Sequence, residues 1–95
     1  MNLEAFPGGD LVEEGLADLS RGVEDSIPAL LVLIGAPRLR RIGLPVPETE
    51  ISISFPEDRL YAKLAESDQD SAHSRYNALI RRLVSFENAA ECVGL

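Results

Sequence analysis

The chain has 95 residues, which is the length of one globular domain, and its formal net charge is −7. Apolar residues make up 45% of the chain and charged residues 26%, a composition that excludes a disordered tail. The longest stretch without a charge, residues 26–37, is too short to span a bilayer, so no membrane segment is expected. The excess of acids repels a phosphate backbone at long range and disfavours nucleic acid as a partner.

The sequence also favours a particular compartment. Its single cysteine, Cys92, allows no disulfide framework and no Cys-x-x-Cys pair, which favours reducing conditions, and we expect this residue to be inert packing. Residues 1–9 contain Glu4 and no basic residue before an apolar core, so they lack the layout of a secretory signal. We therefore expect a cytoplasmic protein.

The first predicted helix spans about residues 11–21. Turn-forming residues 6–9 precede Asp10 and Glu13, whose spacing is that of a capping box with Asp10 as the N-cap. Gly15 lies inside the segment and weakens the helix by about 1 kcal/mol relative to alanine, so the helix needs tertiary packing. Its apolar stripe consists of Val12, Leu16, Leu19 and Val23.

A second helix is predicted to begin after Ser26 as N-cap, with Pro28 in the first turn and Gly35 placed to end it. Residues 29–34 are apolar on every face, so their periodicity fits a buried helix or a buried strand, and the flanking signals favour the helix. A chain of this length can hardly surround such a segment by itself. Its burial by a second copy or by another partner is therefore expected.

The following segment predicts one or two further turns of helix, from Pro37 to Gly43, with Leu44 supplying the hydrophobic contact of a C-terminal cap. Residues 51–55 then alternate with period two, which is typical of a short strand. The competing interpretation makes Ser54 an N-cap and starts a helix that covers residues 55–65, and both can hold in succession. That helix would bury Phe55, Leu60 and Leu64.

The clearest pattern belongs to a long helix expected at about residues 70–93. Its apolar stripe recurs at alternating steps of four and three residues and contains Ala72, Tyr76, Leu79, Leu83, Phe86, Ala90 and Val93. Ile80 and Val84 widen the stripe, which favours packing within one domain over a shared subunit interface. We therefore predict a single all-α domain over residues 1–95, a compact bundle of about four helices with this long helix as its spine.

Few residues indicate catalysis or metal binding. The sole histidine, His73, has no cysteine partner for zinc, and Asp70 one turn before it suits the helix N-terminus better than acid–base catalysis. Glu87 and Glu91 lie one turn apart, as metal-binding carboxylates can, but no Glu-x-x-His pattern completes a di-iron site. A solvated face is the better interpretation of these two glutamates. We expect no enzyme, no metal and no cofactor.

A basic cluster, Arg38, Arg40 and Arg41, lies in a stretch without acids, beside the helix start expected at Pro37. Arginine side chains and the free N–H groups of a helix N-terminus both favour an anion or an acidic partner. The simpler interpretation pairs these arginines with acidic residues of the same chain, within segments 10–25 or 48–70.

Two classes of function remain open. The first is a small non-enzymatic interaction, accessory or regulatory subunit that acts through an apolar helical surface, as a homodimer or with another protein. Its expected interface residues are Leu31, Leu33, Tyr76, Leu79, Leu83 and Phe86. The second is an anion- or phosphate-ligand-binding protein that uses Arg38, Arg40 and Arg41. An enzyme has the least support.

Overall fold

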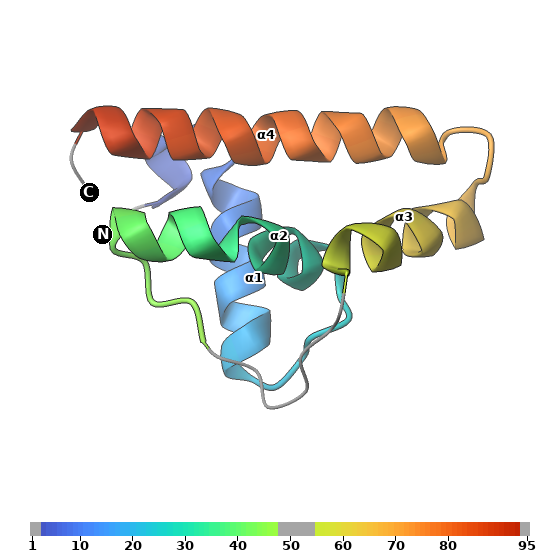
Figure 1. The fold of residues 1–95 in the computed structure, drawn as a ribbon, viewed down its shortest axis with the longest axis horizontal. Helices are drawn as coiled ribbons and strands as arrows, with labels where there is room; N and C mark the ends of the chain where they lie inside the picture. Colours follow the sequence, from blue (N-terminus) through green and yellow to red (C-terminus); the bar gives the residue numbers. More distant parts are fainter. Residues whose placement is uncertain (1–2, 48–54, 94–95) are drawn as a thin grey trace.

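The chain forms four α-helices within residues 3–47 and 55–93, the part that the computed structural model describes (Figure 1). They are α1 (Gly9–Ser20), α2 (Ile27–Ile42), α3 (Pro56–Ser67) and α4 (Ala72–Val93), and the short 3₁₀-helix η1 (Leu3–Ala5) precedes them. The prediction of an all-α bundle with a long C-terminal helix is confirmed.

The helices are arranged around α2. In Figure 1, α4 runs along one side of the molecule, α2 and α3 follow each other beneath it, and α1 crosses α2 steeply. α2 packs against α1, α3 and α4, while α3 also packs against α4. The principal extents of the molecule are 38 × 29 × 18 Å, so it is flat and about two helix layers thick.

α2 is a single helix where the sequence predicted two. As predicted, it starts after Ser26, whose hydroxyl accepts a hydrogen bond from the N–H of Ala29 at 3.1 Å. The predicted end at Gly35 is wrong, because the helix continues through Gly35 and Pro37. Proline inside a helix removes one backbone hydrogen bond and favours a kink, and Figure 1 shows the second half of α2 turned relative to the first.

The predicted end of this segment at Gly43 is confirmed. Gly43 has a φ of 109°, a left-handed conformation that glycine adopts without steric penalty. Its N–H donates to the carbonyl of Arg40 and the N–H of Leu44 donates to the carbonyl of Leu39, both at 3.0 Å. These two hydrogen bonds define a Schellman cap, and the buried Leu44 provides its hydrophobic contact.

α1 begins two residues earlier than expected. Its N-cap is Gly8, with a φ of 74°, so Asp10 lies in the first turn and the predicted capping box is wrong. A Cβ on Gly8 would overlap the backbone carbonyl of Arg82 in α4, so both the turn and the close approach require glycine. Val23 lies beyond the end of α1 and is 43% exposed, so it does not belong to the apolar stripe.

The predicted strand at residues 51–55 falls almost entirely on residues 51–54, which lie outside the described residues, as does the predicted N-cap Ser54. The helix that follows is confirmed as α3, which buries Leu60 and Leu64. Phe55 was expected to be buried as well, but it immediately precedes α3 with a φ of 60° and is 72% exposed.

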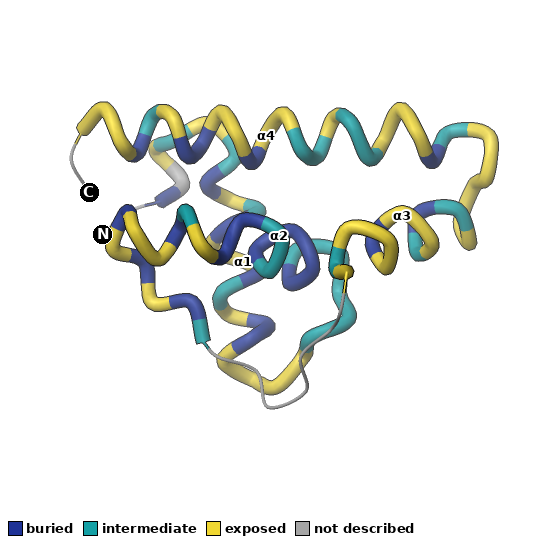
Figure 2. Tube along the Cα trace, viewed as in Figure 1, coloured by how far each residue is buried: buried dark blue, intermediate teal, exposed yellow. Residues whose placement is uncertain are grey.

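The stripe of α4 forms one side of the core. Figure 2, coloured by burial, shows buried and half-buried positions alternating with exposed ones along α4. Ala72, Leu83, Phe86 and Ala90 are buried, Tyr76 and Leu79 are half-buried, and Val93 is 64% exposed at the helix end. The opposing wall comes from α2, whose residues 29–32 are fully buried by the chain itself, while residues 33 and 34 of the same apolar run are half-buried. The first four residues of this run therefore need no partner to bury them.

Candidate functional site

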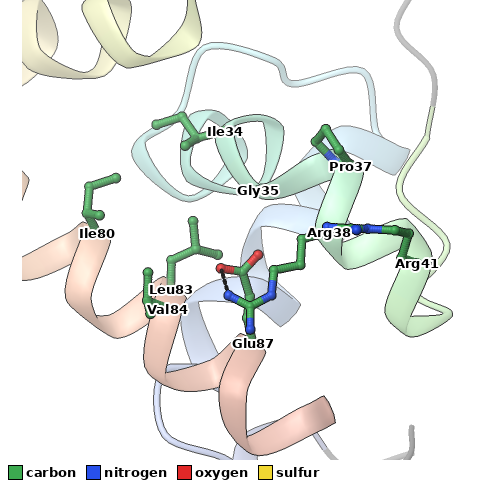
Figure 3. A pocket seen from close by; sticks show the side chains of 9 residues that line it. All are labelled: Ile34, Gly35, Pro37, Arg38, Arg41, Ile80, Leu83, Val84 and Glu87. Atoms are coloured by element: carbon green, nitrogen blue, oxygen red, sulfur yellow. Dashed lines mark ion pairs between the residues drawn. The ribbon is translucent and has the colours of Figure 1, made fainter.

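A groove of about 270 Å³ opens between the second half of α2 and the middle of α4 (Figure 3). Its apolar walls are Ile34 and Pro37 from α2 and Ile80, Leu83 and Val84 from α4. Gly35, Arg38, Arg41 and Glu87 complete the lining. The groove thus has an apolar part and a charged part.

Helical periodicity places these residues together, because side chains three or four positions apart share a face. Gly35 brings the two helices close, since a Cβ at this position would meet the methyl groups of Leu83 at 3.0 and 3.1 Å. Leu83 is buried beneath the groove, whereas Val84 is 40% exposed beside it. Ile34 and Ile80 are half-buried, so the apolar part stays open to solvent.

At the charged part, Arg38 of α2 joins two carboxylates of α4. Its Nε and Nη2 donate to the two carboxylate oxygens of Glu91 at 2.7 and 2.9 Å, and Nη2 also donates to Asn88 Oδ1 at 2.7 Å. Its Nη1 lies 3.6 Å from Oε1 of Glu87, which is only 4% exposed. The arginine therefore pairs with α4, and the prediction that it pairs with segments 10–25 or 48–70 is wrong. The prediction of a solvated face is wrong for the buried Glu87, whereas Glu91 is exposed.

The two glutamates have pKa values displaced in opposite directions. Burial raises the pKa of Glu87, although the charges of Arg38 and Arg41 oppose this effect. The hydrogen bonds from Arg38 lower the pKa of Glu91. The groove lining contains no serine, cysteine or histidine, so what it offers is an apolar contact beside charged groups.

We expect Glu87→Gln to raise the free energy of unfolding at pH 7, because the raised pKa means that ionised Glu87 costs stability. This cost is complete above the raised pKa and absent below the ordinary pKa of glutamate. The advantage of the variant should therefore shrink as the pH falls through that interval. Urea unfolding of the variant and the wild type, followed by circular dichroism from pH 7 to pH 4, measures this difference in stability.

Glu91→Gln is the matched control, with the opposite sign. Its lowered pKa means that ionised Glu91 stabilises the fold above the ordinary pKa of glutamate, and that this contribution is lost as the pH falls through the lowered value. Glu91→Gln should therefore destabilise at pH 7 and converge on the wild type in acid. If the stability difference from the wild type changed with pH in the same way in both variants, the geometry at Arg38 would be contradicted.

The predicted arginine cluster is divided. Arg38 contacts α4, while Nε and Nη2 of Arg40 donate to the carbonyls of Val46 and Pro47 at 3.4 and 3.3 Å. Arg41 is exposed and lines the groove. All three lie toward the C-terminal end of α2, so the expected helix N-terminus with free N–H groups beside them is wrong.

The predicted interface residues are also divided. Leu31, Leu83 and Phe86 are buried in the core of the single chain, and Leu33, Tyr76 and Leu79 are half-buried. The ring of Tyr76 lies against Tyr61 of α3, with the centroids 5.8 Å apart. The sequence missed Ile34 and Pro37 as groove residues, because the predicted break at Gly35 assigned residues 34 and 38 to different helices.

The other candidate residues lie apart from the groove lining. His73 and Asp70 are exposed, and the ring Nε2 of His73 is 3.2 Å from the side-chain nitrogen of Asn77. Cys92 is an exposed free thiol, so the expectation that it packs inside is wrong. Within residues 3–47 and 55–93, no cluster of three or more histidine, cysteine or acidic side chains is arranged to hold a metal ion.

Among the helices that the structure describes, none combines the length and hydropathy that a bilayer crossing needs. Comparisons with protein-family models, with curated proteins and with solved structures find no match for this chain. The α2–α4 groove and the charges around it form the candidate functional site.

Proposed function

We propose that this protein is a small non-enzymatic interaction or accessory subunit that accepts an apolar side chain of a protein partner in the α2–α4 groove. The observation that carries the proposal is the open apolar part of this groove. Val84 is 40% exposed there, and it is joined by Ile34 and Ile80, which are half-buried. Contiguous apolar surface around a concavity is typical of a binding site, whereas single exposed apolar residues are not.

The size of the groove suits a side chain of a protein partner. Its volume of about 270 Å³ lies just below the roughly 300–1,000 Å³ of typical small-molecule pockets. Room for one or two side chains is what a helix-in-groove interaction needs. The alternative function, binding of an anionic ligand by Arg38, Arg40 and Arg41, has less support because the first two are bonded within the chain.

The partner can be a second copy, as in the homodimer that we expected, or a different protein. Because residues 29–32 are already buried by their own chain, the dimer hypothesis now depends on the groove and on the half-buried residues of the two predicted apolar segments, Leu33, Tyr76 and Leu79. Sedimentation of the purified protein at micromolar concentration distinguishes the two kinds of partner.

We predict that Val84→Asp reduces partner binding at least tenfold, because a carboxylate in the apolar part would be desolvated on docking. Val93→Asp is the control, since Val93 is a valine of the same helix, 64% exposed and outside the groove. Quantitative affinity capture from the source cells, with wild type and both variants as baits, makes the comparison. The proposal would be contradicted if every captured protein were retained equally by all three baits.

A further inference from the structure

The charges of this protein are segregated, and the groove lies between its two basic helices. α2 carries three arginines and no acid, and α4 carries three arginines and two glutamates. Because the whole chain has a net charge of −7, its acids are concentrated outside these two helices. The groove lining itself contains two arginines and one glutamate.

Two arginines beside the groove have no ion pair within the described part of the chain. Elsewhere, Arg82 pairs with Asp10 at 3.0 Å, and Arg59 pairs with Asp25 at 2.6 Å. Arg41 lines the groove from α2 and is exposed, and Figure 3 shows its side chain directed toward Arg38.

The second such cation is Arg81, which is exposed on α4 and lies outside the groove lining. It precedes Val84 by three residues, so the two side chains are neighbours on the helix surface. Because Arg38 is engaged by Glu87 and Glu91, Arg41 and Arg81 are the cations around the groove that form no ion pair with another described residue, one on each helix.

We propose, building on the function proposed above, that the groove binds an acidic amphipathic helix of another protein. An aliphatic side chain of that helix lies over Leu83, between Ile34 and Val84. Carboxylates one turn away on the same helix pair with Arg41 and Arg81, since arginine matches a carboxylate with two parallel hydrogen bonds. Charges of this kind speed association and select the partner more than they add affinity.

A helix is the appropriate partner element because both walls of the groove are helices, and helix-in-groove binding uses apolar residues at the same three- and four-residue spacing. The acidic helices of this chain, α1 and α3, already pack their buried apolar residues against α2, so a folded second copy does not present their apolar faces. The groove therefore fits an acidic helix of a different protein better than self-association.

The test uses a displayed library of helical peptides with random surface positions, selected against the wild-type 95-residue chain. Enriched peptides are expected to combine an aliphatic residue with Asp or Glu one turn away, and to bind more weakly as salt increases. For a representative enriched peptide, Arg41→Glu should raise Kd about tenfold or more, because like charges then oppose each other. Arg75→Glu makes the same charge change outside the groove lining and should alter Kd less than about twofold.

A charge-swapped peptide, with lysine in place of the acid that faces Arg41, should recover binding to Arg41→Glu but not to the wild type. If Arg41→Glu unfolds by circular dichroism, Arg41→Gln replaces it, and the preference for acidic over neutral peptides should then disappear.

Three outcomes would overturn the inference. Enrichment of neutral or basic peptides whose binding is lost in Val84→Asp would refute the acidic partner while leaving the interaction function intact. Binding that is indifferent to Val84→Asp would refute both. Sedimentation that shows a dimer disrupted by Val84→Asp would identify a second copy as the occupant.

Discussion

Phe86→Ala should lower the free energy of unfolding by about 3–5 kcal/mol, the usual cost of removing a buried aromatic side chain. Phe86 is among the largest fully buried side chains of the described residues. Its ring also meets that of Phe6 edge to face, with centroids 5.9 Å apart, so it joins the N-terminal segment to α4. A domain of this length has roughly 5–15 kcal/mol of total stability, so the loss is a large fraction.

Urea unfolding of the purified chain, followed by circular dichroism, measures this loss. Val93→Ala is the control, because Val93 lies in the same helix but is 64% exposed, and its truncation should change the stability by no more than about 0.5 kcal/mol. Losses of equal size in the two variants would contradict the position of Phe86 in the core.

The sequence correctly predicted those parts of the fold that depend on residues close together in the chain. The Ser26 cap and the Gly43 cap each depend on residues within five positions, and both are present as expected. The stripe of α4 is a repeating pattern within one helix, and its central residues Leu83 and Phe86 are in the core. Each of these features can be inferred from residues that lie close together in the chain or within one helix.

The parts that it missed depend on contacts between distant segments. Gly35 has the sequence signature of a helix end, but its lack of a side chain is used for the close approach of Leu83. Gly8, 74 positions before Arg82 in the chain, likewise replaces the expected capping residue because α4 passes close to it. Neither contact can be predicted from the residues that adjoin the glycine in sequence.

The groove was missed for the same reason. Arg38 and Glu91 are 53 positions apart, and the sequence offers many acids among which an arginine can find its partner. Only the packing of α2 on α4 selects Glu87 and Glu91, and it also decides that Arg41 is left at the groove. The arginine cluster was visible in the sequence, but its division into three different environments was not.

Gly15→Ala should lower the free energy of unfolding by about 1–3 kcal/mol, although alanine alone would strengthen α1 by about 1 kcal/mol. A Cβ on Gly15 would overlap the backbone carbonyl of Pro28 and a methyl group of Val32, both in α2. The methyl group can rotate away, but the carbonyl belongs to the first turn of α2. The two helices would therefore have to separate, which reduces burial of the apolar residues between them.

Gly35→Ala is the matched control for this prediction. It makes the same exchange inside a helix, but the new Cβ would meet side-chain ends of Leu83 at 3.0 and 3.1 Å, which can move by a few tenths of an ångström. Its measured loss in urea should be clearly smaller than that of Gly15→Ala. A Gly15→Ala protein more stable than the wild type would show that α1 and α2 lie further apart, because helix propensity would then outweigh packing. The residue that weakens α1 in isolation is thus the one that lets α1 cover α2.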